Sequence, residues 1–203
     1  MHGIRLGFLV GASLVGIAAA HATWYTNEAS FVSAINSVYY LEDFNDFTFG
    51  NPLDGSQNTW QAPGANGYGW SASANLGLFS NDGALSTNVA LDPIVLTFAG
   101  NPVTAFGAIL ADTGIDGSEI AGTETLTLSD GESQSIDATT DGFLGWVGGN
   151  PISGVTMTVT GSGGGQDWNQ MDHVYTGAAA VPEPLSVAGV AAGLLALLRR
   201  RRR

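Results

Sequence analysis

A two-residue alternation of apolar and polar side chains constrains the fold of this chain more than any other feature. Residues 155–160 read Val-Thr-Met-Thr-Val-Thr, so every second side chain is apolar and each one between is threonine. In residues 123–128, Leu126 and Leu128 alternate with threonines in the same way. Successive side chains of a β-strand point to opposite faces, so this period predicts strands that bury one face.

Short β-rich runs separated by Gly, Pro, Asn and Asp clusters continue from residue 39 to residue 175. Asp130-Gly131 lies between two such runs and is a hairpin signal, and the mostly apolar run 103–110 is typical of a central strand. About ten short strands predict an all-β fold, an antiparallel two-sheet β-sandwich of jelly-roll type. We expect strands at residues 39–44, 68–72, 76–80, 94–98, 103–110, 123–128, 134–136, 143–147, 155–160 and 173–175.

A single helical pattern precedes these strands. Thr26 or Asn27 can cap a helix, and Glu28 suits the positive end of the helix dipole. Apolar residues recur at i, i+3 and i+4 from Phe31. We therefore predict one short N-terminal helix, at Asn27–Ile35, that closes one end of the β-domain.

The chain contains no cysteine. Disulfides, metal thiolates and thiol nucleophiles are therefore excluded. Between the two terminal segments described below, about 160 residues remain, enough for one domain with a core. That domain must be held by packing alone.

Charge is distributed unevenly along the chain. The six basic residues are Arg5 and the C-terminal run of arginines, whereas all eighteen Asp and Glu lie between residues 28 and 183. Phosphate contacts need basic side chains, so the middle of the chain is unsuited to nucleic acid. It is also repelled by anionic lipid surfaces. Solubility is the generic explanation of such an acidic surface.

The C-terminus combines three signals. Pro182, Glu183 and Pro184 favour an extended, accessible stretch, and the uncharged residues 185–198 follow. As a helix these fourteen residues rise about 21 Å, short of the roughly 30 Å hydrocarbon core. Positive charge directly after an apolar segment is retained on the cytoplasmic side, so we interpret this segment as a transmembrane stop-transfer helix. The retaining arginines are Arg199, Arg200, Arg201, Arg202 and Arg203.

This order of Pro-Glu-Pro, apolar helix and terminal arginine cluster resembles the PEP-CTERM sorting signal. The resemblance covers residues 181–203. It implies that the motif is recognised by a membrane protease, exosortase, in a Gram-negative bacterium that exports polysaccharide. An ordinary tail anchor is the alternative, although it would not need the Pro-Glu-Pro motif.

The N-terminus has the pattern of a signal peptide. Arg5 gives a thin positive region, residues 6–20 are apolar, and Ala20-His21-Ala22 is an Ala-x-Ala cleavage site. We predict a signal peptide at residues 1–22 and an exported domain at residues 23–180. The precursor would be anchored in the inner membrane, and the processed protein would reach the cell surface or the extracellular matrix.

Four segments of the exported part are similar, in their order, to sandwich domains that often precede PEP-CTERM signals. Those domains look distantly like lectin and carbohydrate-binding-module sandwiches. The resemblance covers about 130 residues and implies a fold more than an activity. Its segments are residues 98–107, Gly145-Trp146, Pro151-Ile152 and residues 171–177.

No catalytic residue is predicted. Residues 23–180 contain one histidine, His173, with Asp172 beside it. A Ser-His-Asp arrangement would also need a nucleophile elbow, and none is present. Pairs of carboxyl groups, which glycoside hydrolysis requires, are unavoidable among eighteen acids and so carry little information. We expect a protein that is not an enzyme.

Aromatic residues in polar loops are the better indication of a ligand. Trp60, Tyr68 and Trp70 lie in or beside the Gly-, Asn- and Gln-rich residues 55–69, and Trp168 lies within residues 161–171. Flat aromatic faces beside amides and carboxylates are what sugar rings stack on. The alternative is that Trp60 and Trp70 only cover the end of the sandwich. Trp146, inside a strand, is expected in the core.

A Ca²⁺ site is a further hypothesis. Residues 112–119 read Asp-Thr-Gly-Ile-Asp-Gly-Ser-Glu, so Asp112, Asp116 and Glu119 could supply carboxylates around two turn-forming glycines. The spacing differs from that of an EF-hand, and a solvated loop is the alternative. Similarity to lectin-like sandwiches, which commonly hold a structural Ca²⁺, favours the site.

The sequence therefore predicts a secreted surface or matrix protein that an exosortase-type protease processes. Its β-sandwich would have a structural or glycan-binding role with extracellular polysaccharide. The alternatives are a polysaccharide-acting enzyme and a purely structural component that binds no ligand.

Overall fold

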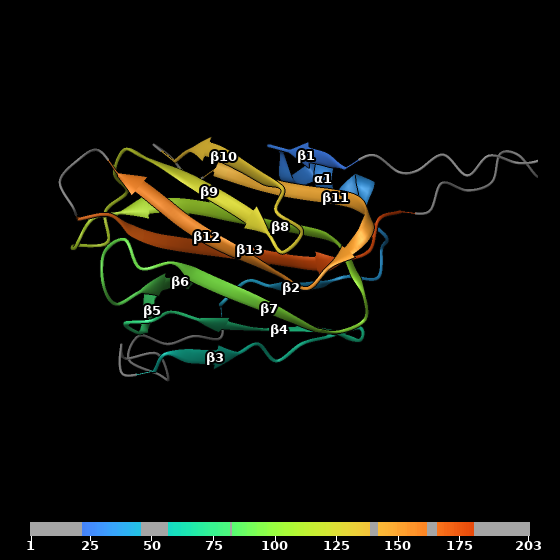
Figure 1. Ribbon diagram of the computed structural model, residues 1–203, viewed down its shortest axis with the longest axis horizontal. Coiled ribbons are helices and arrows are strands. Elements are labelled where there is room, and N and C mark those ends of the chain that lie inside the picture. Colours follow the sequence, from blue (N-terminus) through green and yellow to red (C-terminus); the bar gives the residue numbers. More distant parts are fainter. Residues whose placement is uncertain (1–21, 46–56, 82, 139–141, 162–165, 181–203) are drawn as a thin grey trace, which may run out of the picture.

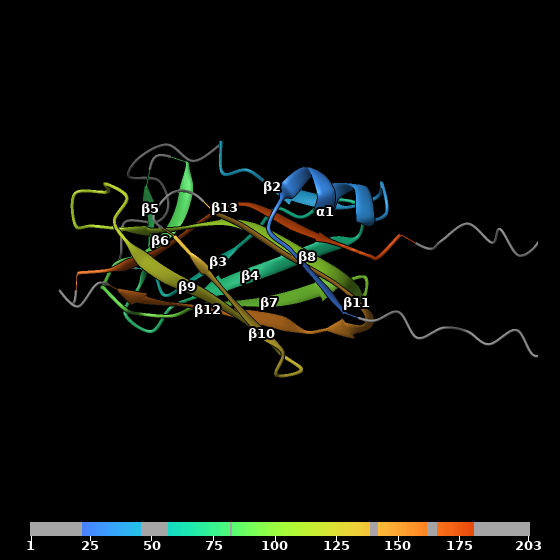
Figure 2. The ribbon, with the colours of Figure 1, turned by 90° about the horizontal axis from the view of Figure 1, so that it is seen from above.

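The fold consists of two antiparallel β-sheets packed face to face (Figures 1 and 2). The computed structural model describes residues 22–45, 57–81, 83–138, 142–161 and 166–180. Within these ranges the one α-helix is α1 (Glu28–Ala34), so the predicted all-β sandwich with one short helix is confirmed.

Sheet 1 has seven strands and sheet 2 has six. In sheet 1 the order is β1 (Thr23–Tyr25), β11 (Gly142–Ile152), β8 (Val103–Thr113), β13 (Trp168–Gly177), β6 (Ala84–Thr87) and β5 (Leu78–Asn81), and β2 (Tyr40–Glu42) also pairs with β13. In sheet 2 the order is β10 (Ser133–Asp137), β9 (Gly122–Leu128), β12 (Gly154–Gly161), β7 (Ile94–Gly100), β4 (Tyr68–Ser73) and β3 (Thr59–Gln61).

From β6 onward the chain crosses between the sheets at almost every step. Strands β6, β8, β11 and β13 lie in sheet 1, and strands β7, β9, β10 and β12 lie in sheet 2. Each sheet is therefore built from segments far apart in the sequence, and strands that are neighbours along the chain face each other across the core.

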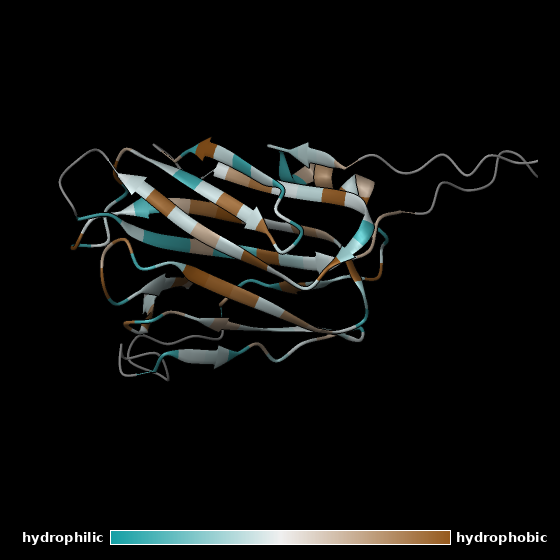
Figure 3. Ribbon diagram, viewed as in Figure 1, coloured by the Kyte–Doolittle hydropathy of each residue, from teal (hydrophilic) through white to brown (hydrophobic). Residues whose placement is uncertain are grey.

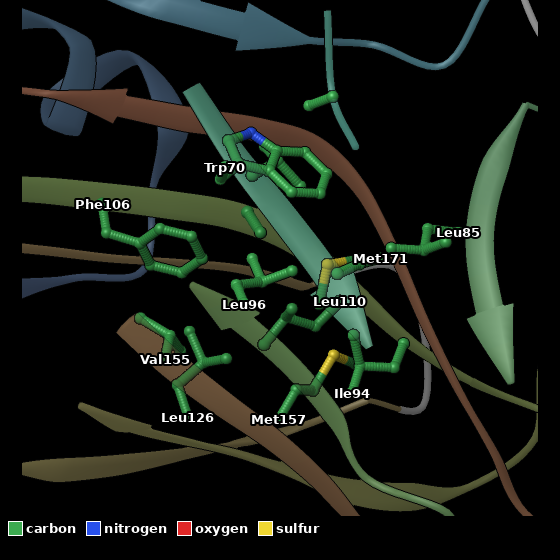
Figure 4. Close-up of a cluster of buried hydrophobic side chains, with 14 of the residues drawn as sticks. Trp70, Leu85, Ile94, Leu96, Phe106, Leu110, Leu126, Val155, Met157 and Met171 are labelled. Atoms are coloured by element: carbon green, nitrogen blue, oxygen red, sulfur yellow. The ribbon is translucent and has the colours of Figure 1, made fainter. Parts of the chain in front are cut away.

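The core lies between the two sheets. Alternating side chains along β9 and β12 point into it, which Figure 3 shows as bands of brown and paler colour along both strands. Side chains from the two sheets converge there (Figure 4). Fully buried members include Trp70, Ile94, Leu96, Phe106, Leu110, Leu126 and Met157. Trp146 is also buried in this core, as predicted.

All ten expected strands overlap an observed strand, but the sequence pattern missed β1, β3 and β6. Strand β13 begins at Trp168, five residues before its predicted start. Its first half, Trp168 to Asp172, has no regular apolar alternation, yet Asn169 is buried, so this burial follows from the neighbouring strands β8 and β6 rather than from its own pattern. The hairpin at Asp130-Gly131 is present, with Gly131 at φ +94°.

Helix α1 begins as predicted, because the Asn27 side chain accepts a hydrogen bond of 2.9 Å from the Ser30 backbone N–H. It packs on the outer face of sheet 1 rather than closing an end of the sandwich. Phe31 is buried there against the rings of Phe143 and Tyr175, over strand positions occupied by glycine.

No helix within the described ranges is long and apolar enough to cross a membrane. The expected transmembrane segment, residues 185–198, and the Pro-Glu-Pro motif lie outside those ranges, as do residues 1–21 of the expected signal peptide.

Candidate functional site

An open hollow of about 400 Å³ lies beside the N-terminal end of β13. Strand register explains its lining. Trp168 pairs with Thr113, and Phe79 pairs with Ser86, so these side chains share the outer face of sheet 1. This end of the sandwich is remote from α1 (Figure 1). The turn after β8 forms another wall of the hollow.

The hollow combines aromatic and polar groups. Its lining residues include Trp168 and Phe79 together with Asn88 and Asp116. Ile115 is 76% exposed at its rim. Such a lining can stack a planar or ring-shaped ligand and hydrogen-bond its polar groups.

The carboxylate of Asp116 is held in place by its own turn. Its Oδ1 accepts hydrogen bonds from the Ser118 backbone N–H at 3.1 Å and from the Ser118 hydroxyl at 2.6 Å. These bonds hold the pKa of Asp116 below its usual range. The hollow therefore presents an ionised acceptor at neutral pH.

Of the four aromatic residues predicted to contact sugar, Trp168 is the one that lines this hollow. Trp70 is fully buried and Tyr68 is 8% exposed, because both occupy inward positions of β4. Trp60 on β3 is half-buried, with its ring 5.2 Å from that of Trp70. Tyr68 and Trp70 belong to the core between the sheets, and Trp60 packs against it. The alternative considered for Trp60 and Trp70 was that they cover the end of the sandwich.

His173 links β13 to α1. Its Nδ1 lies 3.2 Å from Oε1 of Glu28, and the Tyr175 hydroxyl donates to the same oxygen at 2.6 Å. The register of β13 against β8 shifts between Asp172 and Tyr175, and His173 has φ +45° within that irregularity. These contacts hold the helix to the sheet.

The three residues predicted to bind Ca²⁺ do not gather in one place. Asp112 lies near the end of β8 with its side chain fully buried, whereas Asp116 and Glu119 are exposed in the turn that follows. Backbone hydrogen bonds close that turn, including Gly114 N–H to the Ser118 carbonyl at 2.8 Å.

Asp112 instead belongs to a buried polar group between the sheets, which we call the interior acidic group. Its members are Asp112 on β8, Glu124 on β9, Asp167 just before β13, and Asn169 on β13. Asp112, Glu124 and Asn169 are 0% exposed, and Asp167 is 2% exposed. Register pairs Asn169 with Asp112.

Most oxygen atoms of this group lack a hydrogen-bond partner among the described residues. This applies to both carboxyl oxygens of Asp112, both of Glu124, and Oδ1 of Asn169, except where a shared proton joins Asp112 to Asp167 by a side-chain hydrogen bond. Buried polar atoms in folded proteins are almost always hydrogen-bonded, so a group of such atoms in one place needs an explanation.

Two glycines make room for the group. Gly122 on β9 and Gly161 on β12 are register partners. A Cβ atom at Gly122 would lie 1.9 Å from Oδ2 of Asp112, and one at Gly161 would lie 1.7 Å from Cγ of Asp167. The two carboxyl groups thus occupy the space that side chains at these positions would fill.

The electrostatics of the group favour protonated acids. Burial raises the pKa of Asp112 to about 7, and the neighbouring Asp167 charge adds to this. Burial, with a contribution from Asp112, raises the pKa of Glu124 to about 10. Residues 23–180 contain no Lys or Arg that could compensate.

As they lie, no three or more Asp, Glu or His side chains in the described part of the chain are arranged to hold a metal ion. The carboxyl groups are neighbours but do not converge on one point. Any shared ligand would require side-chain rotation.

Sequence reasoning missed this group, although one signal was present. In residues 123–128, Glu124 occupies the same alternation phase as Leu126 and Leu128, which is the inward phase. A charged residue in a core phase indicates a buried site. Its partners come from other strands, which the sequence alone does not bring together.

Comparisons with family models, with curated proteins and with solved structures gave no match. The geometry of the site and the sequence signals therefore carry the functional argument.

Proposed function

We propose that this chain is a secreted protein of the cell surface or extracellular matrix whose β-sandwich binds a glycan in the hollow around Trp168. The observation that carries the proposal is the position of Trp168 and Phe79, which line one open hollow together with amide, hydroxyl and carboxylate groups.

The chemistry of the hollow suits sugar rings. The apolar face of a pyranose stacks on an indole, while its hydroxyls need donors and acceptors beside the ring. Asn88 and Asp116 offer an amide and an ionised carboxylate at the required place. A rigid sheet supports this lining, since Trp168 and Thr113 are paired strand residues.

The architecture supports the same proposal. The alternation of strands β6 to β13 between the two sheets follows the order of a jelly roll, so we assign the sandwich to that type. Jelly rolls are used by lectin domains. Similarity of fold supports glycan binding only by analogy, in addition to the residues that line the hollow.

Charge narrows the class of glycan. Residues 23–180 carry no Lys or Arg, and Asp116 lies in the hollow. A uronate-rich or sulfated polysaccharide would be repelled by this surface. We therefore assign the hollow to a neutral or amino-sugar glycan.

Sorting is proposed from the terminal sequences. The signal peptide would direct export, and the Pro182-Glu183-Pro184 motif with residues 185–198 and the arginine run would present the precursor to an exosortase-type protease. The precursor would be held in the inner membrane until processing.

Binding of the full chain to a glycan array tests the proposal. We expect retention of neutral or amino-sugar glycans by the wild type, and loss of at least tenfold in affinity for Trp168→Ala and for Phe79→Ala. Trp60→Ala changes a predicted aromatic residue that does not line this hollow, and so serves as the comparison variant. Thermal melting of each variant checks that the fold is intact.

Three results would contradict glycan binding in this hollow. Unchanged affinity of Trp168→Ala would place the ligand elsewhere. If no glycan were retained, the protein would instead be a structural matrix component that binds no ligand. Release of shortened products from the array would indicate an enzyme instead.

A further inference from the structure

We propose that the interior acidic group is a divalent-cation site, specific for Ca²⁺, and that the bound ion joins the two sheets beneath the start of β13. The proposal does not depend on glycan binding. It differs from the turn predicted from sequence, since of those three residues only Asp112 takes part.

Burying the carboxyl groups of Asp112 and Glu124 without a compensating charge is costly. Asp112 and Glu124 are 0% exposed, and no backbone or amide N–H among the described residues donates to their carboxyl oxygens; Asp112 can form a side-chain hydrogen bond with Asp167 when the two acids share a proton. Removing a carboxylate from water is strongly unfavourable unless a compensating charge is present. Residues 23–180 contain no Lys or Arg, so protonation and a bound cation are the two forms of compensation that remain.

The Asn169 amide also places an oxygen atom beside these acids. Its Nδ2 donates to the Asp92 carbonyl at 2.7 Å, which orients the amide, while its Oδ1 is buried and has no partner. Asn169 and Asp112 are register partners, so both side chains extend from the same face of sheet 1. A protonated carboxyl group beside it could donate a hydrogen bond to this oxygen, and a neutral amide oxygen is also an ordinary Ca²⁺ ligand.

The atoms available to coordinate an ion in this group are all oxygens. Each of the three carboxyl groups offers two oxygens and the amide offers one, with no nitrogen or sulfur donor among these residues. Such a set suits hard cations rather than zinc or copper. Ca²⁺ takes six to eight oxygens in flexible geometry, whereas Mg²⁺ demands a near-ideal octahedron and keeps its waters. A buried site lined by protein oxygens therefore favours Ca²⁺.

Two glycines leave space for the interior acidic group. Gly122 and Gly161 face each other on adjacent strands of sheet 2, and each lacks the Cβ that would collide with Asp112 or Asp167. A core of this kind would ordinarily be filled with apolar side chains. The carboxyl groups do not converge as they lie, so ion binding would draw them together by rotation about their side-chain bonds.

Metal content and melting temperature of the full chain test the proposal. After dialysis against micromolar CaCl₂, we expect about one Ca²⁺ retained per chain by elemental analysis. Millimolar CaCl₂ should raise the melting temperature by several degrees relative to EDTA at matched ionic strength, because a ligand that binds only the native state stabilises it. MgCl₂ should produce a clearly smaller shift.

Variants locate the ion. Glu124→Gln and Asp167→Asn should lose the retained Ca²⁺ and the Ca²⁺-dependent shift. In EDTA, Glu124→Gln should melt at or above the wild-type temperature, because the amide keeps the shape of the carboxyl group and stays neutral at every pH. Asp116→Asn and Glu119→Gln are matched controls in the exposed turn and should keep both the ion and the shift.

Two results would overturn the proposal. Equal melting temperatures in EDTA and CaCl₂, with no ion retained, would show that the buried acids are simply protonated. Loss of the shift in Asp116→Asn or Glu119→Gln, with Glu124→Gln unaffected, would place the ion in the exposed turn instead.

Discussion

The carboxyl group of Asp112 occupies the space that a side chain at Gly122 would need: a Cβ atom on Gly122 would lie 1.9 Å from Oδ2 of Asp112. One residue belongs to sheet 1 and the other to sheet 2. The absence of a side chain on one sheet thus allows a buried acid on the other. The same relationship holds between Asp167 and Gly161.

Substituting alanine for Gly122 tests this relationship. We expect Gly122→Ala to lower the free energy of unfolding by about 1–3 kcal/mol, the typical cost of adding a carbon to a packed interior. Urea denaturation measures the change. Gly69→Ala on β4 is the matched control, because a Cβ there meets no atom within 4 Å. A cost as large for Gly69→Ala would contradict the steric explanation.

The double substitution Asp112→Ala with Gly122→Ala gives a second check. Removing the carboxyl group makes room for the new methyl group, so the double variant should lose less stability than the sum of the two single variants. Strict additivity would show that the two residues do not compete for space.

Stability in EDTA should fall as pH rises. The pKa of Asp112 is raised from 3.8 to about 7 and that of Glu124 from 4.5 to about 10, so the folded state holds protons that the unfolded chain has released. The free energy of unfolding should therefore decrease from about pH 4 upward, through pH 7 for Asp112 and on toward pH 10 for Glu124. Each group contributes at most about 1.4 kcal/mol per pH unit.

Urea denaturation at pH 5, 6, 7 and 8 in EDTA measures this dependence. Glu124→Gln removes one of the two titrating groups and should flatten the decrease. An identical slope in that variant would mean that repulsion among surface carboxylates, rather than the interior acidic group, causes the pH dependence.

Two tryptophans should differ sharply in their effect on stability. Trp70 is fully buried in the core (Figure 4), so Trp70→Ala should cost about 3–5 kcal/mol. Trp168 lines an open hollow and is half-buried, so Trp168→Ala should cost much less. Comparable losses in urea denaturation would show that Trp168 is a structural residue.

Sorting is tested at Glu183. If the Pro-Glu-Pro motif is a protease recognition element, Glu183→Ala should leave full-length protein in the membrane with its arginine tail attached. The mass of the mature protein distinguishes the two forms. A normally removed tail in the variant, or an intact tail in the wild type, would argue against the proposal.

Local patterns in the sequence were enough to predict much of the fold. Strict alternation in residues 155–160 predicted β12, and a capping residue at Thr26 or Asn27 predicted the start of α1, where Asn27 is the cap. These signals are readable because they depend on the chain's own geometry, the two-residue period of a strand and the unpaired N–H groups of a helix start. They also predicted Trp146 in the core.

Elements whose stability comes from their neighbours were missed. Strand β6 carries the short sequence Ala-Leu-Ser-Thr, and the first half of β13 has no regular apolar alternation. Both are strands because flanking strands pair with them, since β13 lies between β8 and β6. The position of α1 on the outer face of sheet 1 likewise depends on glycines in strands β8 and β11.

The sequence by itself determined the charge, the alternation and the terminal signals. Only the tertiary structure decided which acids meet. Asp112 was grouped with Asp116 and Glu119 because they are close in sequence, whereas the fold turns Asp112 inward toward Glu124 and Asp167. Strand β8 ends at Thr113, so Asp112 still points into the core, whereas Asp116 and Glu119 lie in the exposed turn that follows. Nearness along the chain therefore does not bring carboxylates together, but the packing of two sheets does.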